Sequence, residues 1–241
     1  MDAAGQVLAM KTSDAGDLVV GQAASNRLRR MPRFPHAIAP GATFPRRTLD
    51  HEARYRRLLL LVKHPDGPLE DYLVVRDELA TTEPATFNLF VLARSVRRDG
   101  QAFHFDGQLE ADAVLYVATP ADGKVEISNW AWPKQDASSL IPEGFQVGKD
   151  RWRTGEMQQW VRITEMPGRP FLTVLYPCRK GSPAPVFQTL ADGRGVRVTL
   201  GQATEDVFLA TDPAGEAGGQ AVVMRGGRKT VILPAKGVPP L

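Results

Sequence analysis

The sequence predicts an all-β protein: a layered antiparallel β-sandwich of about 12–16 short strands with little helix. Short runs rich in Val, Leu, Phe and Tyr recur along the whole chain, and clusters of Gly, Pro, Asn and Asp separate them. No amphipathic helical pattern exceeds about ten residues. Residues 1–241 are therefore expected to form a single sandwich domain, a length at which such folds commonly remain one unit.

The first part of the chain predicts two strands and then a long loop. Gln6–Met10 and Asp17–Gly21 have the composition of short strands. Residues 22–50 contain Pro32, Pro35, Pro40 and Pro45, too many prolines for a helix or a central strand. We therefore predict a basic, proline-rich loop at about 22–50.

A hairpin follows the predicted loop. Arg56–His64 is an apolar run with charged ends, typical of a strand that is covered on both faces, although its leucines also suit a helix. The turn His64–Pro68 contains Asp-Gly between two prolines, and Asp71–Asp77 supplies the second strand. Asp77 is expected to pair with a basic side chain or to cap the turn, because it has no opposed carboxylate in sequence.

The rest of the chain continues in the same way, with turns at Pro120–Gly123, Gly218-Gly219 and Gly226-Gly227. The further predicted strands are Ala85–Ala93, Gln101–Phe105, Ala113–Ala118, Lys124–Trp130, Met157–Thr164, Phe171–Tyr176, Val196–Leu200, Val207–Ala210, Gln220–Arg225 and Thr230–Leu233.

Composition excludes several classes of function. The net charge of +3 combines an excess of five positive charges in residues 1–57 with an excess of two negative charges in the remainder, so one surface is basic and the protein as a whole is not. Nucleic acid is not predicted as a partner, because no nucleic-acid module accompanies the arginines.

The longest apolar run, Leu58–Val62, is too short for a membrane span, and no secretory signal is visible. The single cysteine, Cys178, cannot form an internal disulfide and is interpreted as a structural thiol.

Catalytic motifs are absent from the sequence, and no cofactor or metal is predicted. The candidate catalytic residues are His104, which lies in a predicted strand, and Asp106, which follows that strand and whose carboxylate could orient the imidazole. A solvent-facing strand histidine explains the same pattern without catalysis. Glu126 is an alternative carboxylate for an enzyme built around His104.

Aromatic and basic residues are the candidates for substrate binding. Trp130 and Trp132 lie two positions apart, so in an extended segment they form one platform for sugar rings or, equally, part of the core. Two further tryptophans, Trp152 and Trp160, lie close in sequence to arginines, which suits an anionic saccharide or, equally, structural cation–aromatic contacts; the arginines are Arg151, Arg153 and Arg162. Arg29, Arg30 and Arg33 could bind sulfate or uronate groups through their guanidinium forks, or could be a solvated loop face.

Three blocks of the chain resemble the C-terminal β-sandwich region of heparinase II/III-like polysaccharide lyases. The blocks are Gly16–Ala23 with Ala53–His64, then Asp71–Leu79, then Phe171–Pro177 leading to Gly195–Val198 and Asp206–Leu209. Their order and spacing carry the resemblance, since each block alone is an ordinary apolar strand.

The resemblance implies a sandwich fold and an association with acidic polysaccharides. Members of this family join an α/α-toroid to the sheet domain and cleave by β-elimination, with catalytic Tyr and His residues from the toroid and a further His from an early strand. No histidine here matches that motif, so no catalytic residue is carried over. The sequence therefore predicts a module that is not catalytic by itself, binds anionic polysaccharide and partners a toroid domain or chain.

Two alternatives remain open: a complete small lyase or epimerase on a sugar-binding sandwich, and a structural domain that docks on a separate catalytic chain. The family suggests a periplasmic or extracellular, bacterial-type secreted enzyme.

Overall fold

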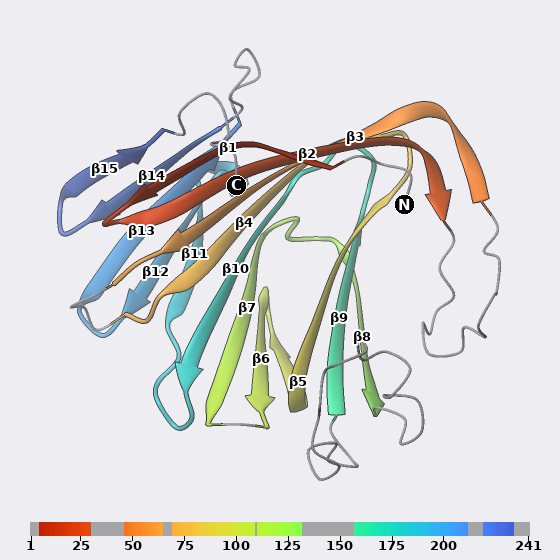
Figure 1. Cartoon of the computed structure of the whole chain (residues 1–241). Helices are drawn as coiled ribbons and strands as arrows, with labels where there is room; N and C mark the ends of the chain where they lie inside the picture. Colours follow the sequence, from red (N-terminus) through yellow and green to blue (C-terminus); the bar gives the residue numbers. More distant parts are fainter. Residues whose placement is uncertain are drawn as a thin grey trace, which may run out of the picture.

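A computed structural model describes residues 5–29, 46–64, 69–108, 110–131, 157–211 and 219–233. Within these ranges the chain forms fifteen β-strands, one 3₁₀ turn (η2, Ala191–Gly193) and no α-helix, which confirms the predicted all-β class (Figure 1). The described part of the chain thus contains no helix of the length and apolarity that crossing a membrane requires.

Ten strands form a large antiparallel sheet in the order β1-β2-β3-β4-β10-β7-β6-β5-β9-β8. Its strands are β1 (Gln6–Ser13), β2 (Gly16–Arg29), β3 (Arg46–Val62), β4 (Tyr72–Ala80), β5 (Ala85–Asp99), β6 (Ala102–Gly107), β7 (Ala111–Thr119), β8 (Lys124–Ala131), β9 (Met157–Glu165) and β10 (Phe171–Arg179).

The other five strands form a small antiparallel sheet in sequence order. They are β11 (Val186–Leu190), β12 (Gly195–Leu200), β13 (Ala203–Ala210), β14 (Gln220–Arg225) and β15 (Arg228–Ile232). The small sheet covers one face of the large one, and a single apolar core fills the space between them. Fully buried members of this core include Leu58, Leu60, Val174, Val198 and Leu209.

The large sheet also curls back onto its opposite face. The first half of β5 pairs with β9 and its second half pairs with β6, with a register shift between Ala93 and Ser95. A second apolar core lies between the curled strands and the sheet, and it includes Phe103, Leu115, Ile163 and Phe171. The fold is therefore a sandwich in which one layer is strongly curved.

A buried polar cluster joins the two sheets near the end of β3. The Glu205 carboxylate, fully buried, accepts hydrogen bonds from Tyr72 Oη (2.6 Å) and Arg225 Nε (2.7 Å), and its Oε2 lies 2.9 Å from His64 Nε2. Burial alone would raise the pKa of Glu205, but its hydrogen bonds with His64 and Tyr72 and the charges of His64 and Arg225 outweigh burial and lower it. The cluster ties the small sheet to the large one.

The expected hairpin and the expected burial of the thiol are confirmed. β3 pairs with β4 in continuous register from Arg54↔Ala80 to Val62↔Tyr72. Cys178 is a buried, free cysteine in β10, and burial raises the pKa of its thiol.

The expected loop at 22–50 is wrong at both ends. β2 continues to Arg29 and β3 begins at Arg46, and the two strands pair as far as Arg29↔Arg46. These added segments contain no proline, so each residue can take part in the ladder. The four prolines lie outside the described residues. Several strands are also longer than expected: β3 has 17 residues and β5 has 15. The strand β11 was not predicted.

Candidate functional site

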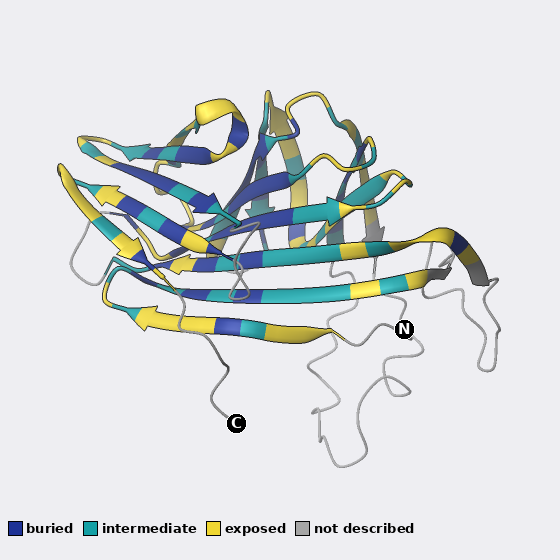
Figure 2. Ribbon diagram, turned by 90° about the horizontal axis from the view of Figure 1, so that it is seen from above, coloured by how far each residue is buried: buried dark blue, intermediate teal, exposed yellow. Residues whose placement is uncertain are grey.

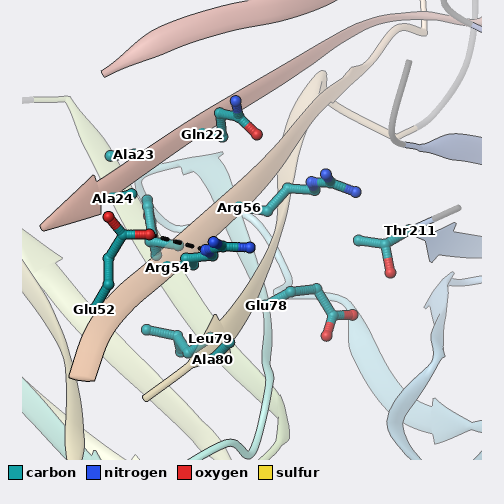
Figure 3. A pocket seen from close by; sticks show the side chains of 11 residues that line it. Gln22, Ala23, Ala24, Glu52, Arg54, Arg56, Glu78, Leu79, Ala80 and Thr211 are labelled. Atoms are coloured by element: carbon teal, nitrogen blue, oxygen red, sulfur yellow. Dashed lines mark hydrogen bonds and ion pairs between the residues drawn. The ribbon is translucent and has the colours of Figure 1, made fainter. Parts of the chain in front are cut away.

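The candidate site is a groove of about 580 Å³ on the large sheet, beside the small one (Figure 3). Three strands supply nearly all of its lining, and Thr211 lies just beyond the end of β13. The residues that line it are Gln22, Ala23, Ala24, Glu52, Arg54, Tyr55, Arg56, Glu78, Leu79, Ala80 and Thr211.

Strand register explains why these side chains share the groove. Gln22 lies opposite Arg56, and Arg56 lies opposite Glu78, so the three form one row across β2, β3 and β4. The next row holds Ala24, Arg54 and Ala80, and its two alanines leave the space that makes the groove.

The groove continues a face that is buried elsewhere. Every second residue of β3 from Arg54 to Leu60 faces the same side of the sheet. On this side Leu58 and Leu60 lie under the small sheet, whereas Arg54 and Arg56 lie past its edge. Figure 2 shows this change along β2 and β3, from buried residues at one end to more exposed residues farther along.

The two groove arginines differ in whether they have an ion-pair partner. Arg54 Nε donates to Glu52 Oε1 at 2.9 Å, and both side chains are largely exposed. Glu78 accepts a hydrogen bond from Arg76. Arg56 has no hydrogen-bond or ion-pair partner among the described residues, and its side chain extends away from β3 toward the side where Thr211 lies (Figure 3). Its guanidinium donors are therefore available to an anion.

The groove leads into a basic arm. Beyond Arg54, the β2–β3 hairpin bends away from the body of the sheet (Figure 1) and contains Arg27, Arg29, Arg46 and Arg47.

The opposite face of the same strands is held by an ion pair whose carboxylate, that of Asp77, is buried. Arg57 donates twice to Asp77, at 2.7 and 2.8 Å, and Tyr55 Oη donates to the same carboxylate at 3.0 Å. Burial, followed by the charge of Asp77, raises the pKa of Tyr55 far above its ordinary value. This confirms the expectation that Asp77 pairs with a basic side chain, and it fixes β3 against β4 directly behind the groove.

The predicted catalytic candidates lie in a second cavity, of about 320 Å³, lined by β5, β6, β7 and β10. His104 and Asp106 both line it, together with Arg97, Asp112 and Cys178. Burial, and then the charge of Arg97, lowers the pKa of His104, so its imidazole is neutral at neutral pH.

The carboxylate of Asp106 is committed to another partner. Lys180 Nζ lies 2.6 Å from Asp106 Oδ1 and 3.0 Å from Asp112 Oδ1. His104 has no hydrogen bond to Asp106 within the described residues, so the carboxylate does not orient the imidazole. No set of three potential metal ligands gathers anywhere in the described part of the chain.

The predicted binding residues are only partly described. Arg29 is the last residue of β2, opposite Arg46, and Trp130 lies in β8 opposite Gln158. Arg30, Arg33 and Trp132 lie outside the described residues. The substrate-binding role of all five stays a prediction.

Sequence analysis missed Arg54 and Arg56 as site residues. The available signal was the alternation Arg54-Tyr55-Arg56, which places two cations on one face of a strand. Glu126 lies in β8 opposite Arg162 of β9, forms an ion pair with Lys124, and does not line the cavity of His104.

No protein-family model and no curated protein sequence matches this chain. Among solved structures it resembles a heparinase III gene product with methylated lysines, with a TM-score of 0.52 and 14% identity, over 96% of this chain and 27% of that one. Heparan sulfate lyase HepC from Pedobacter heparinus matches with a TM-score of 0.45 and 8% identity, over 98% of this chain and 29% of that one. A mutant of the same lyase matches with a TM-score of 0.45 and 8% identity, over 96% of this chain and 28% of that one.

This chain therefore spans less than a third of the length of each of these proteins. At 14% identity the likeness to the heparinase III establishes a shared fold and nothing beyond the fold. It thus confirms, for the fold, the resemblance predicted from the three sequence blocks.

Proposed function

We propose that this chain is a β-sandwich domain of a polysaccharide-lyase system, and that it binds an anionic polysaccharide in the groove of Arg54 and Arg56. The observation that carries the proposal is the guanidinium of Arg56, which has no partner among the described residues and lines an open groove beside Arg54. The fold shared with a heparinase III supports the class of ligand.

The geometry of the groove suits a linear polyanion. An open channel lined by strand side chains admits a chain from both ends, and arginine forks bind carboxylate or sulfate groups through paired hydrogen bonds. Among the described lining residues, the two carboxylates of the groove, Glu52 and Glu78, each already bind an arginine, so neither is free to act as a general base. The domain would thus hold the polysaccharide while a partner supplies the base.

The partner would be a larger catalytic domain. The heparinase III that shares this fold is more than three times as long as the region matched here. We propose an α/α-toroid on the same or a separate chain as the catalytic partner. Co-purification of this protein with a toroid-bearing chain tests the pairing, and separate elution at micromolar concentration would argue against a separate chain.

Binding is tested by calorimetric titration with heparin, alginate and chondroitin oligosaccharides. Replacing Arg54 and Arg56 together by Ala is expected to lower affinity about tenfold or more, since a hydrogen bond to a charged group contributes about 1.5–3 kcal/mol. Arg179→Ala is the matched control, because this arginine is 84% exposed and lies outside the groove. Equal affinity of the double variant and the control would refute the groove.

A second candidate function has one observation in its favour: His104, Asp106 and Arg97 line one cavity. A small lyase could use the neutral His104 as the base and Arg97 to neutralise a uronate. The test is the absorbance of unsaturated uronate products, first for the unmodified protein and then for His104→Ala. Turnover that this substitution abolishes would overturn the non-catalytic proposal, and absence of turnover with every polymer would remove the second candidate.

A further inference from the structure

An exposed aromatic patch lies on the outer face of β5, β9 and β8, away from the groove. Strand register builds it in two rows. Asn88, Arg162 and Glu126 lie opposite one another, and in the next row Phe90 lies opposite Trp160. The alternate residues of these strands, such as Val161 and Ile163, face the second core.

The patch exposes more apolar surface than a solvent-facing strand requires. Phe90 is 47% exposed and Leu92, two residues along the same strand, is 45% exposed. The rings of Phe90 and Trp160 are stacked, with centroids 5.3 Å apart and planes 9° apart. Trp160 thus supports one face of the Phe90 ring, and the exposed part of Phe90 offers an apolar surface against which the C–H face of a pyranose can pack.

The indole is held in place from two sides. Trp160 Nε1 donates to Asn88 Oδ1 at 3.1 Å, which fixes the rotation of the ring. The guanidinium carbon of Arg162 lies 5.6 Å from the centroid of the same indole, within the range of a cation–π contact. The aromatic surface and the cation are therefore positioned as one unit.

Arg162 has hydrogen-bonding capacity that the described residues do not use. Its Nε is buried without a hydrogen-bond partner, and its contact with Glu126 Oε2 is 3.7 Å long, beyond hydrogen-bond range. The side chain is 36% exposed. A cation that is stiffened against an indole, and whose Nη1 is engaged only by this long ion pair, is suited to a carboxylate or sulfate from solvent.

We propose that Phe90, Trp160 and Arg162 form a subsite for one residue of an acidic sugar chain. The apolar face of the sugar ring packs on the exposed Phe90 ring, which Trp160 supports, and its carboxylate or sulfate accepts hydrogen bonds from Arg162. The class of ligand rests on the proposed function, but the surface is distinct from the groove of Arg54 and Arg56. A patch that only stabilised the sheet would affect unfolding and leave glycan affinity unchanged.

The test compares full-length variants by calorimetric titration. Phe90→Ala and Arg162→Gln are each expected to weaken binding about tenfold, because a hydrogen bond from a charged donor is worth about 1.5–3 kcal/mol and aromatic contact is of similar size. Lys124→Gln is the matched control, since it removes a cation that is 75% exposed on the same face and is expected to change affinity less than about twofold. Circular dichroism confirms that each variant is folded.

Two ligands separate the sources of the anion. Alginate oligosaccharides contain carboxylates only, heparin oligosaccharides add sulfates, and neutral dextran is the reference without charge. Arg162→Gln should weaken binding to the anionic ligand that the patch prefers and reduce its salt dependence, whereas Phe90→Ala should weaken binding without changing the salt dependence.

The outcomes distinguish this proposal from the groove. Loss of affinity in the Phe90 and Arg162 variants alone supports the patch and overturns the groove. Loss in the Arg54/Arg56 double variant alone supports the groove and overturns the patch. Unchanged affinity in all folded variants, or no binding by the unmodified protein, overturns both.

Discussion

The contact between the two sheets should depend strongly on the charge of one buried carboxylate. Replacing Glu205 by Gln keeps the size of the side chain and one carbonyl oxygen, but removes the charge that Arg225 and Tyr72 bind. Because Glu205 is fully buried, water cannot replace the lost interactions without opening the sheets.

The magnitude follows from the exposure of the partners. Removing one member of a buried ion pair costs about 3–5 kcal/mol. Arg225 is 40% exposed and can regain water, which lowers the cost, whereas the Tyr72 hydroxyl is buried and keeps only a neutral acceptor. We expect Glu205→Gln to lower the free energy of unfolding by about 3 kcal/mol at pH 7.

The pH dependence gives a second check. The pKa of Glu205 is lowered in the folded protein, so its stabilisation is complete above the ordinary pKa of 4.5 and is lost as the pH falls through the lower folded pKa. The difference between the unmodified protein and the variant should therefore be largest at neutral pH and should shrink in acid.

Urea unfolding followed by circular dichroism at several pH values measures both effects. Glu52→Gln is the control, because Glu52 pairs with an exposed arginine and its loss should cost less than about 1 kcal/mol. If Glu205→Gln is as stable as this control, the cluster does not hold the two sheets together.

Three further predictions concern other buried contacts. Asp77→Asn should lower the free energy of unfolding by about 2–3 kcal/mol, because it breaks the paired hydrogen bonds from Arg57, and an unchanged urea midpoint would contradict this. Cys178 should react with a thiol reagent at pH 8 about tenfold or more slowly in the folded protein than in urea, since burial raises its pKa and reduces the thiolate, and equal rates would show that the thiol is accessible. Gly107→Ala should cost about 3 kcal/mol, as its Cβ would lie 1.7 Å from the carbonyl oxygen of Ala111, and a melting temperature within about 2 °C of the unmodified protein would refute the contact.

The fold class could be predicted because strand and turn signals are local. Alternation and turn residues identify most strands without knowledge of their partners. The position of β10 between β4 and β7 could not be predicted, because that order depends on pairing between segments far apart in sequence. The ends of β2 at Arg29 and of β3 at Arg46 were also missed, because these two segments pair with each other and that pairing is not visible in either segment alone.

The candidate sites were predictable only in part. His104 and Asp106 could be named as candidates because they are neighbours in sequence, but Lys180, which binds Asp106 from 74 positions away, cannot be found in the local pattern. Arg54 and Arg56 become a site only because the small sheet stops short of them, and no local pattern reveals where one sheet ends over another.

Side-chain NMR of the arginine Nε–Hε groups tests the groove most directly. Titration of isotope-labelled protein with a heparin oligosaccharide should shift the Nε resonances of Arg54 and Arg56, while that of Arg179 stays in place. If the Arg54 and Arg56 resonances do not move at saturating ligand, the groove does not hold the polysaccharide.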